Sequence, residues 1–237
     1  MVQPFRSRTA YHSELWKGVK IELADGERIV VSCPAPLRTL SSAVHLGGFA
    51  AANHIVNWKV PLSYKGADPG ADAEVQLAKW GLNAVETVCL LTAAKLTHAS
   101  VAEEDGDCFK LVCCTTSGTS NGARAGMSRK SFSAYAPGTI NTVLLIDGHM
   151  SDSAMVNAVI QASEAKAAAL QDLGIADAEN GSIATGTTTD AIVVGVSGRG
   201  YNGAVHAYAG AATTIGNAIG RLVYETVYEA SRTQLEQ

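Results

Sequence analysis

Apolar residues recur every three to four positions in two long stretches of the chain, which is the spacing of helices with one buried face. The first stretch spans residues 153–173, and Gly174 is expected to end it. The second spans about residues 213–232, with Thr213 or Thr214 as its N-terminal cap. The positions expected to face inward are Val156, Val159, Ile160, Ser163, Ala167 and Leu170 on the first helix, and Ile215, Ile219, Leu222 and Val227 on the second.

Two shorter stretches also predict helices. Residues 40–57 place Leu46, Phe49, Ala50 and Asn53 along one side of a helix. Residues 73–80 predict a short helix after a loop that contains prolines and glycines. In the last helix, the small residues Gly216 and Gly220 lie on adjoining turns and are expected to permit close packing.

Short apolar runs bounded by turn residues predict strands. Residues 19–21 and 27–33 are expected to form a hairpin around the Ala-Asp-Gly turn at 24–26, and Pro34 and Pro36 to end its second strand. A second hairpin is expected to connect residues 96–102 and 108–115 through an acidic turn. Further buried strands are predicted at residues 87–91, 139–146 and 190–196.

This order of elements indicates the fold class. Hairpin-linked strands followed by a few substantial helices favour a mixed, largely antiparallel sheet covered by helices over regular β-α-β winding. We therefore expect an α/β protein of the α+β type. No internal repeat or low-complexity linker interrupts the sequence, so residues 1–237 are expected to form a single layered domain.

Composition narrows the possible functions. The net charge of −4 and the lack of a Lys/Arg run argue against nucleic-acid binding. No stretch of about 18 uncharged apolar residues is present, so no membrane span is expected. The five cysteines lack the spacing of a disulfide framework, and Cys113 and Cys114 should point to opposite faces of a strand, so we expect reduced thiols and a cytoplasmic protein. The apolar, lightly charged composition would suit a homodimer.

Two short segments carry polar groups that cannot build a core. Residues 118–126 read Gly-Thr-Ser-Asn-Gly-Ala-Arg-Ala-Gly, and residues 138–142 read Gly-Thr-Ile-Asn-Thr. Such side chains bury little apolar surface and compete locally for backbone hydrogen bonds. We interpret both segments as donors and acceptors assembled around a polar ligand.

Four motifs in order carry a resemblance to a known family. They are the Ser-Asn-x-Ala-Arg-Ala-Gly segment at 120–126, Gly-Thr-Ile-Asn at 138–141, Glu-Ala-Lys at 164–166 and Ala-Thr-Gly-Thr-x-Thr-Asp at 184–190. Together they resemble the adenosylcobinamide amidohydrolase family, the corrinoid-salvage enzymes called CbiZ, from about Val31 to Glu229. Each motif alone consists of common small residues, and the specificity lies in their shared order.

Candidate catalytic residues come from these motifs. On a helical wheel, Glu164 and Lys166 fall near opposite edges of the apolar face, where both could extend to solvent. The resemblance favours Glu164 as an acid/base or substrate anchor. Asp190, at a strand entry beside several threonines, could cap its turn or orient a nucleophile, and the resemblance favours function. The other catalytic candidates are Asn121 for an oxyanion, and Ser120 or Thr187 as nucleophile.

Candidate substrate-binding residues are Arg124, Asn141, Thr185, Gly186 and Thr188 from the same motifs, together with Asn53 and His54. Local turn stabilisation would explain Asn121 and Asn141 equally well. One position departs from the family, for which Leu-Asn-Gly-Gly is expected. Here Leu46 takes the place of the asparagine, which either alters recognition at that corner or transfers the role to His45.

Three other patterns are interpreted as structural. The Gly-x-Gly-x-x-Gly run at 198–203 lacks an acidic residue on a second strand and is read as a loop over the substrate, not a dinucleotide site. The Asp-x-His at 147–149 lacks the glycine of base-off cobalamin proteins. The acidic turn at 103–107 lacks the spacing of a calcium loop, so no metal site is expected.

The resemblance implies hydrolysis of the amide that joins aminopropanol to the corrin side chain of adenosylcobinamide. No cofactor of the protein's own is implied, since the cobalt belongs to the corrinoid substrate. The residues leave direct water attack and a covalent acyl-enzyme both open. Two alternatives use the same groups, namely an amidohydrolase for a different amide, such as an intact cobamide, and a corrinoid-binding protein without turnover.

Overall fold

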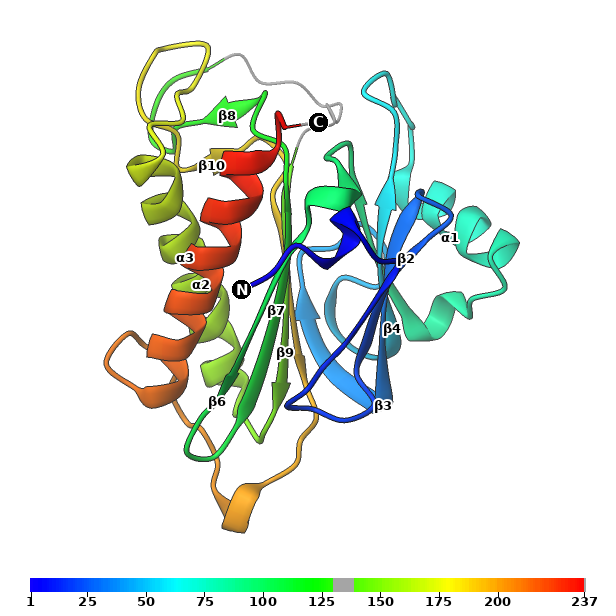
Figure 1. Ribbon diagram of the computed structural model, residues 1–237, viewed down its shortest axis with the longest axis vertical. Helices are drawn as coiled ribbons and strands as arrows, with labels where there is room; N and C mark the ends of the chain where they lie inside the picture. Colours follow the sequence, from blue (N-terminus) through cyan, green and yellow to red (C-terminus); the bar gives the residue numbers. More distant parts are fainter. Residues whose placement is uncertain (130–138, 237) are drawn as a thin grey trace.

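The computed structural model describes residues 1–129 and 139–236 (Figure 1). Its strands are β1 (Ala10–His12), β2 (Lys20–Ala24), β3 (Arg28–Ser41), β4 (Gly48–Lys59), β5 (Thr87–Thr92), β6 (Ser100–Asp105), β7 (Lys110–Ser117), β8 (Gly122–Ala123), β9 (Ile140–Asp147), β10 (Gly186–Thr187) and β11 (Ala191–Val196). Its helices are α1 (Pro69–Lys79), α2 (Asp152–Asp172) and α3 (Thr214–Thr233). Short 3₁₀ turns occupy Pro4–Arg6, Ala84–Glu86, Leu96–His98 and Tyr201–Gly203.

One mixed sheet organises the described residues. Its main path follows the order β1-β2-β3-β11-β9-β7-β6, and β4 branches from β3 to pair with β5. The β9–β11 and β4–β5 pairs are parallel, and the remaining pairs of this sheet are antiparallel. The predicted α+β fold with a mixed, largely antiparallel sheet is therefore confirmed.

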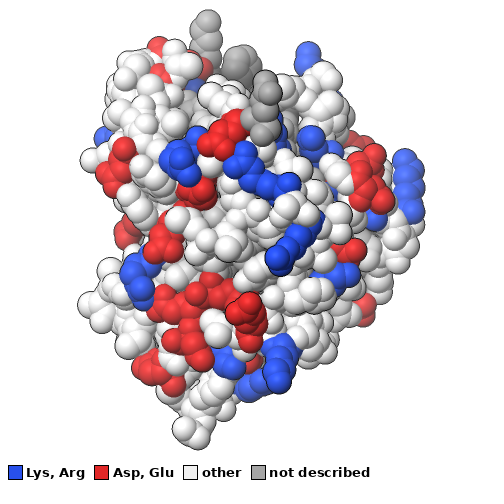
Figure 2. Space-filling model, in the orientation of Figure 1, with Lys and Arg blue, Asp and Glu red and all other residues white. Residues whose placement is uncertain are grey.

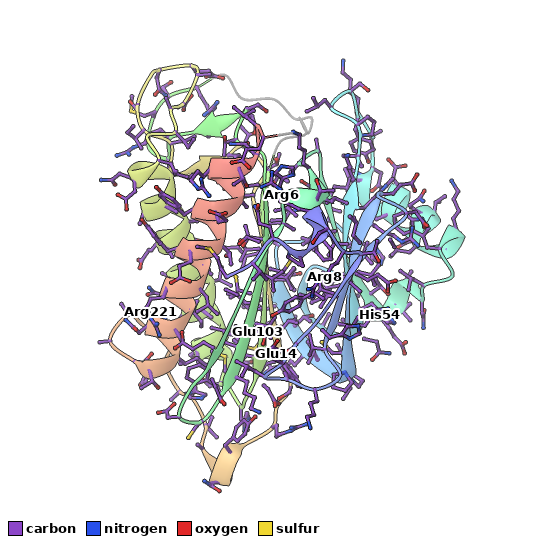
Figure 3. All side chains as sticks on the ribbon, viewed as in Figure 1. Arg6, Arg8, Glu14, His54, Glu103 and Arg221 are labelled. Carbon is purple, nitrogen blue, oxygen red and sulfur yellow. The ribbon has the colours of Figure 1, made fainter. Side chains whose placement is uncertain are left out.

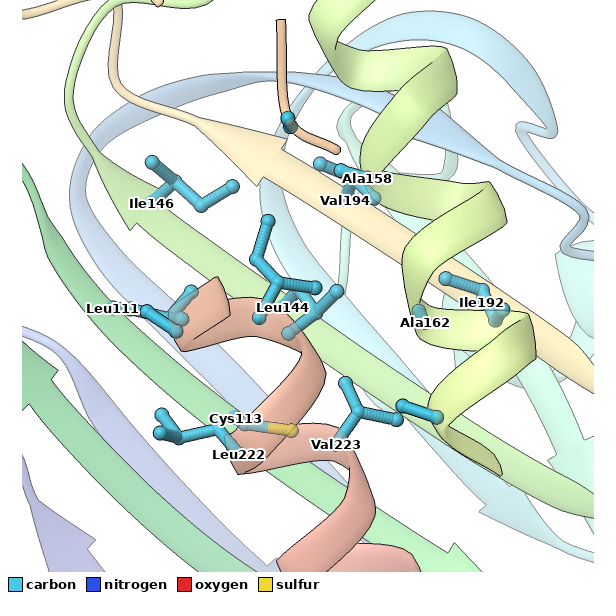
Figure 4. Packing of buried hydrophobic residues seen from close by; sticks show 14 of the residues in the cluster. Leu111, Cys113, Leu144, Ile146, Ala158, Ala162, Ile192, Val194, Leu222 and Val223 are labelled. Atoms are coloured by element: carbon cyan, nitrogen blue, oxygen red, sulfur yellow. The ribbon is translucent and has the colours of Figure 1, made fainter. Parts of the chain in front are cut away.

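Helices α2 and α3 cover one face of strands β7, β9 and β11 (Figure 1). Leu144 and Ile146 of β9 and Leu222 and Val223 of α3 belong to this core (Figure 4). The inward positions predicted for α3 are all buried, and Thr213 caps the helix by accepting a hydrogen bond from the backbone N–H of Gly216.

The buried face predicted for α2 is wrong except at Leu170, which is fully buried, and Val159, which packs against the core. Val156 and Ile160 are 46% and 49% exposed. The buried residues of the helix are Ala154, Met155, Ala158, Ala162, Ala165, Ala169 and Leu170. Alanine side chains let the backbone of α2 approach the sheet and α3 closely, and a search for large apolar residues overlooks such a face.

A second core lies on the other face of β7, β9 and β11, where β2, β3, β4 and β5 pack against them. Side chains of β7 alternate between the two faces of the sheet, so Cys113 lies in the helix-covered core and Cys114 in this second core. The two cysteines therefore point to opposite faces, as predicted. Helix α1 buries Ala73 and Leu77 against β4 and β5. It begins at Pro69, earlier than expected, because Asp68 caps it.

The helix predicted for residues 40–57 is wrong. Residues 48–59 form β4, which pairs with β3 on one side and β5 on the other. The prolines at 34 and 36 do not end β3 either. They lie where the β3–β4 register shifts, between Ser32 and Leu37. Proline lacks the N–H that a regular ladder needs, and an irregularity of this kind accommodates it.

The other predicted strands and both hairpins are confirmed, including the hairpin between β6 and β7. Its first strand begins later than predicted, because residues 96–98 form a 3₁₀ turn, and residues 103–105 of the expected acidic turn belong to β6. Acidic side chains gather in this region on the face drawn in Figure 2. Glu103 accepts a hydrogen bond from the backbone N–H of Leu15, and Glu104 forms an ion pair with Arg221 of α3. Glu103 and Arg221 are labelled in Figure 3. Among the described residues, no helix has the length and apolar character needed to cross a membrane.

The close packing at the start of α3 generates a prediction. A Cβ at Gly216 would lie 2.1 Å from the carbonyl oxygen of Gly210 and 2.4 Å from that of Ala209. We expect Gly216→Ala to lower the free energy of unfolding by about 1–3 kcal/mol. This loss should outweigh the gain of about 1 kcal/mol in helix propensity. Urea unfolding measures it.

Gly210→Ala is the matched control, because a Cβ there meets no atom within 4 Å. Equal free energies of unfolding for the two variants would contradict the prediction, because they would show that the backbone around Gly216 can move to accommodate a Cβ.

Candidate active site

Two of the polar motifs meet in a two-stranded ribbon beside the main sheet. Strand β8 comes from the 118–126 segment and β10 from the 184–190 segment, and they pair antiparallel (top of Figure 1). Gly186 lies opposite Ala123, and Thr187 lies opposite Gly122. The Ala-Thr-Gly loop and the Ser-Asn-Gly loop are therefore neighbours in the fold, although about 60 residues separate them in sequence.

The carboxylate of Asp190 accepts the hydrogen bonds that connect the segments of this region. Its Oδ1 accepts hydrogen bonds from the backbone N–H of Ile140, at 3.0 Å, and from the hydroxyl of Thr187. Its Oδ2 accepts from the backbone N–H of Thr187, at 2.9 Å, and from the ammonium of Lys166. The Asp190 and Lys166 side chains are only 11% and 12% exposed. Four donors use about the full acceptor capacity of a carboxylate.

Gly186 is required by this arrangement. A Cβ at that position would lie 2.4 Å from Oδ2 of Asp190 and 3.0 Å from Nζ of Lys166. Any side chain there would push the ion pair apart. Gly186, predicted to bind substrate, also makes room for the Lys166–Asp190 pair.

An open polar pocket of about 710 Å³ lies between α2 and the two loops. On α2, Ser163 and Ala167 form a strip along its floor, with Glu164 on one side and Lys166 on the other. Glu164 and Lys166 were predicted at opposite edges of the apolar face of α2, but the observed buried face is a different one. The strip between the two residues faces the pocket and not the core. Glu164 is exposed, so the burial expected for it is absent. The loop residues along the pocket are Ala123, Arg124, Ala125, Gly126, Met127, Arg129, Thr185, Gly186, Thr187, Thr188, Thr189 and Asp190.

Two smaller cavities also reach Asp190. One, of about 250 Å³, lies against β5 and the start of α1 and shares Thr188, Thr189 and Asp190 with the polar pocket. The other, of about 300 Å³, lies between α2 and β3 and shares Ser163, Lys166 and Asp190 with it. Asp190 therefore stands where three cavities adjoin.

Asp177 anchors the loops that form the pocket, although the sequence analysis did not select it. Its side chain is fully buried, and its carboxylate accepts from the backbone N–H of Arg124 at 2.8 Å and of Glu179 at 2.9 Å. The side chains of Arg129 and Asn180 donate to it as well. The hydrogen bonds from the Arg124 and Glu179 backbone hold the pKa of Asp177 below its ordinary value.

Several predicted site residues make local contacts that hold the loops together. The hydroxyl of Thr185 accepts from the backbone N–H of Ala125 at 3.0 Å. Asn121 donates through Nδ2 to the hydroxyl of Thr188 at 2.6 Å. Arg124 donates to the carbonyl of Ile183 at 3.1 Å while lining the pocket. Neither Ser120 nor Asn121 is among the described residues that line the three cavities.

The predicted binding residues Asn141, Asn53 and His54 lie elsewhere. Asn141 is 1% exposed, and its Nδ2 donates to Asn57 and to the carbonyl of Leu91 inside the core. Asn53 and His54 are on β4 (His54 is labelled in Figure 3). The side-chain amide of Asn53 donates a hydrogen bond to Glu86, and His54 Nδ1 shares a hydrogen bond with the hydroxyl of Ser32. Gly138, from the same motif as Asn141, lies outside the described residues.

Lys166 is the functional candidate that sequence reasoning passed over. It was interpreted as a helix-boundary residue, whereas it is largely buried and held by Asp190. The signal was available in the Glu-Ala-Lys motif, but the partner of Lys166 is 24 residues away and becomes visible only in the fold. Among the described residues, no group of three His, Cys, Asp or Glu side chains is placed to hold a metal ion.

The loop at 198–203 does not cover this pocket, and that prediction is wrong. It follows β11, whereas Asp190 precedes the strand, so the two lie at opposite ends (Figure 1). There Arg199 and Tyr201 donate to the buried carboxylate of Asp147, with the Tyr201 hydroxyl at 2.7 Å.

A polar pocket flanked by a carboxylate and a held ammonium group suits acid–base chemistry on a polar substrate, the class of site that a hydrolase needs. Comparison with known proteins agrees. The chain belongs to the adenosylcobinamide amidohydrolase family, CbiZ, whose pattern it matches over residues 13–237. Members of this family hydrolyse an amide bond, and this chain is an enzyme of that type.

The chain is also similar to three individual proteins, two of which carry the name adenosylcobinamide amidohydrolase. The chain is 32% identical over 203 residues to an uncharacterized protein of Methanocaldococcus jannaschii, covering 77% of this chain and 78% of the relative. It is 32% identical over 148 residues to the adenosylcobinamide amidohydrolase of Methanosarcina mazei, covering 62% of this chain and 64% of that protein. For the adenosylcobinamide amidohydrolase of Halobacterium salinarum, the identity is 34% over 147 residues, covering 58% and 55%.

The buried carboxylate of Asp177 generates a pH prediction. Because its folded pKa is lowered, its stabilising effect is present above its unfolded pKa of about 3.9 and is lost as the pH falls through the folded value. We expect Asp177→Asn to lower Tm at pH 7, and the difference from wild type to shrink on acidification below about pH 4. Thermal unfolding followed by circular dichroism from pH 7 to pH 3 measures this.

Asp25→Asn is the control, since its side chain is 74% exposed in the β2–β3 turn and should show little effect at any pH. A Tm difference for Asp177→Asn that stayed constant with pH would contradict the expected role of the ionised carboxylate.

Proposed function

We propose that this protein hydrolyses the amide that joins aminopropanol to the corrin side chain of adenosylcobinamide. The products are adenosylcobyric acid and aminopropanol, which would return a scavenged corrinoid to cobamide synthesis. Family membership supports the reaction type. The observation that carries the proposal is that Glu164 and Lys166 both line one open polar pocket, on either side of the Ser163 and Ala167 strip.

The pocket suits a large polar substrate. A corrin carries amide side chains around its rim, and these need hydrogen-bond donors and acceptors from the protein. Arg124, Thr185 and Thr188 supply such groups along the loops. The cobalt enters and leaves as part of the substrate, and we propose no cofactor of the protein's own.

Lys166 is placed to stabilise the charge that develops during amide hydrolysis. Attack on the carbonyl carbon moves negative charge to its oxygen, and a fixed ammonium group nearby lowers the energy of that state. Because Asp190 holds the Lys166 side chain in place, little reorganisation is needed when the charge forms. In this proposal Lys166 serves as the oxyanion donor instead of Asn121, whose amide is engaged by Thr188.

Glu164 is the group that we propose as general base and acid. Asp190 already accepts four hydrogen bonds and would have to lose one to take a proton from water. Glu164 is exposed at the pocket and suits that task better. Asp190 is then a positioning residue that acts through Lys166 and Thr187.

Direct attack by water on the amide proceeds in two proposed steps. Glu164 takes a proton from water, and the water oxygen bonds to the amide carbon while the carbonyl oxygen becomes negative beside Lys166. The C–N bond then breaks, and the nitrogen leaves with the proton that Glu164 returns. The acid product ionises, and the released amine takes up a proton from solvent.

Thr187 offers a covalent route. Its hydroxyl donates to Asp190, so attack by Thr187 on the amide carbon would send its proton to that carboxylate. Asp190 would pass that proton to the amide nitrogen as the C–N bond breaks, so that the amine leaves and an ester to Thr187 remains. Water would then hydrolyse the ester, which releases the acid and restores the Thr187 hydroxyl. Detection by mass spectrometry of an adduct on the peptide that contains Thr187 would favour this route over direct attack by water.

Incubation of the purified protein with adenosylcobinamide tests the function directly, with adenosylcobyric acid and aminopropanol followed by mass spectrometry. Release of both supports the proposal. A shift in the visible spectrum without release would instead indicate a corrinoid-binding protein. Release of these products from an intact cobamide but not from adenosylcobinamide would indicate a different amide substrate.

Variants test the assigned roles. We expect Glu164→Gln to lower kcat by about 10²–10⁴-fold and Lys166→Met by about 10²–10³-fold. Lys166→Arg should retain more activity than Lys166→Met, because it keeps the charge. Glu74→Gln, on the exposed side of α1, is the control and should keep full activity. Full activity of Glu164→Gln would remove Glu164 from the mechanism.

Leu46 departs from the family pattern, and its backbone offers an explanation. Leu46 has a φ of 54°, in the left-handed region that asparagine adopts more readily than leucine. Leu46 also lines none of the three cavities that adjoin Asp190. An asparagine at this position would therefore serve the turn and not the substrate.

The corresponding prediction is that Leu46→Asn changes kcat/KM for adenosylcobinamide by less than about twofold. Its Tm should also change little, since relief of the left-handed backbone, worth about 1 kcal/mol, offsets the loss of a half-buried side chain. Steady-state kinetics and thermal unfolding measure both. A tenfold gain in kcat/KM would show instead that the side chain at 46 contacts substrate.

A further inference from the structure

The small cavity of about 250 Å³ lies on the other side of the 188–190 loop from the polar pocket. Val44, Val60, Leu90 and Leu91 give it apolar walls, and Tyr64 and Pro69 close it from the α1 side. Ser42, Thr92 and Thr139 add hydroxyl groups. The cavity is thus mainly apolar, with a few polar groups and one carboxylate, that of Asp190.

The small cavity, at about 250 Å³, cannot hold the corrin ring of the substrate. A drug-sized ligand needs a cavity of roughly 300–1,000 Å³, and a corrin is larger than most such ligands. The open pocket of about 710 Å³ is the place for a corrin edge. A short amino alcohol, in contrast, fits within the small cavity.

The chemistry of the cavity matches that fragment. An aminopropanol carries a methyl group, a hydroxyl and, once released, an ammonium group. The aliphatic walls suit the methyl. Ser42 already accepts from the backbone N–H of Ile192, and Thr139 donates to the carbonyl of Thr189, but each hydroxyl oxygen retains capacity to accept a further hydrogen bond.

The charged residues along the two small cavities also favour this one for the amine. Asp190 lines the cavity, and its carboxylate can face an ammonium ion once one of its four donors, such as the Thr187 hydroxyl, turns away. No Lys or Arg is among the described residues that line this cavity. The other small cavity, of about 300 Å³, includes Lys166, whose ammonium would repel a protonated amine. Of the two, the cavity beside Leu90 and Leu91 is therefore the one whose described lining has no cation.

We propose that the cavity lined by Val44, Val60, Tyr64, Leu90 and Leu91 binds the aminopropanol portion of the substrate and retains it as the leaving amine. The proposal rests on the proposed function. The scissile amide then lies across the 188–190 loop, with the corrin on the Glu164 and Lys166 side and the amino alcohol on the Leu90 side.

Product inhibition tests this assignment. We expect 1-amino-2-propanol to inhibit turnover of adenosylcobinamide, and uncharged 1,2-propanediol to inhibit far less, because it lacks the group that meets Asp190. Val44 is 40% exposed and lines the cavity, so Val44→Phe should narrow the cavity without disturbing a core. It should raise the inhibition constant of the amine by about tenfold.

Two matched variants complete the design. Val156→Phe narrows the other small cavity, and Val85→Phe adds the same bulk at a 74% exposed position that lines none of the three cavities. Both should leave the inhibition constant within about twofold of wild type. If Val156→Phe raised it and Val44→Phe did not, the leaving group would belong in the other cavity. Absence of inhibition by the amine during normal turnover would also overturn the proposal.

Direct binding separates this proposal from the proposed function. Ligand-observed NMR with 1-amino-2-propanol needs no turnover, and we expect a signal from wild type that weakens in Val44→Phe and persists in Val85→Phe. That outcome without hydrolysis of adenosylcobinamide would retain the amine cavity and reject the proposed substrate. If Val44→Phe lowers Tm, Val44→Leu provides a milder narrowing, and an unchanged NMR signal in it would count against the assignment.

Discussion

The paired charges of Lys166 and Asp190 hold together the three segments that form the site. Asp190 reaches α2 through Lys166, the first residue of β9 through the N–H of Ile140, and its own loop through Thr187. Both charged groups are largely shielded from water. A charge buried in this way without a partner would lower the stability of the fold by several kcal/mol. Each group therefore requires the other, and the position of α2 relative to the 184–190 loop follows from that requirement. The polar pocket and both smaller cavities share this boundary.

The pair forms only because the surrounding structure allows close approach. Gly186 leaves space beside the two side chains. The alanines on the buried face of α2 bring that helix near the sheet, so that Lys166 can reach Asp190 while Ser163 and Ala167 remain along the pocket. Asp177 then fixes the opposite wall by binding the backbone of Arg124. A set of small residues and two buried carboxylates thus shapes a site whose chemistry depends on a few charged side chains.

The sequence predicted the elements whose patterns are local. Helix α3, strands β5, β9 and β11, and both hairpins follow from periodicity and turn residues within each segment. The helix predicted at 40–57 failed because its alanines and mixed polar positions fit helical spacing, and pairing with β3 and β5 decided the outcome instead. The site shows the same division. Glu164, Arg124 and the threonines of the 184–190 loop were found by motif, whereas Lys166 and Asp177 depend on partners 24 and 53 residues away.

The position of the site at one end of the sheet also has a physical basis. In sheets with parallel strands, ligands commonly bind beyond the carboxyl ends of those strands. Here that end of the β9–β11 pair is occupied, since Asp147 is 1% exposed and receives hydrogen bonds from Ser197, Arg199 and Tyr201. At the opposite end, the entry of β11 leaves the Asp190 carboxylate beside three cavities. The glycine-rich run at 198–203 therefore closes the end where a nucleotide would normally bind. The polar pocket lies at the amino ends of the strands, beside the Lys166–Asp190 pair.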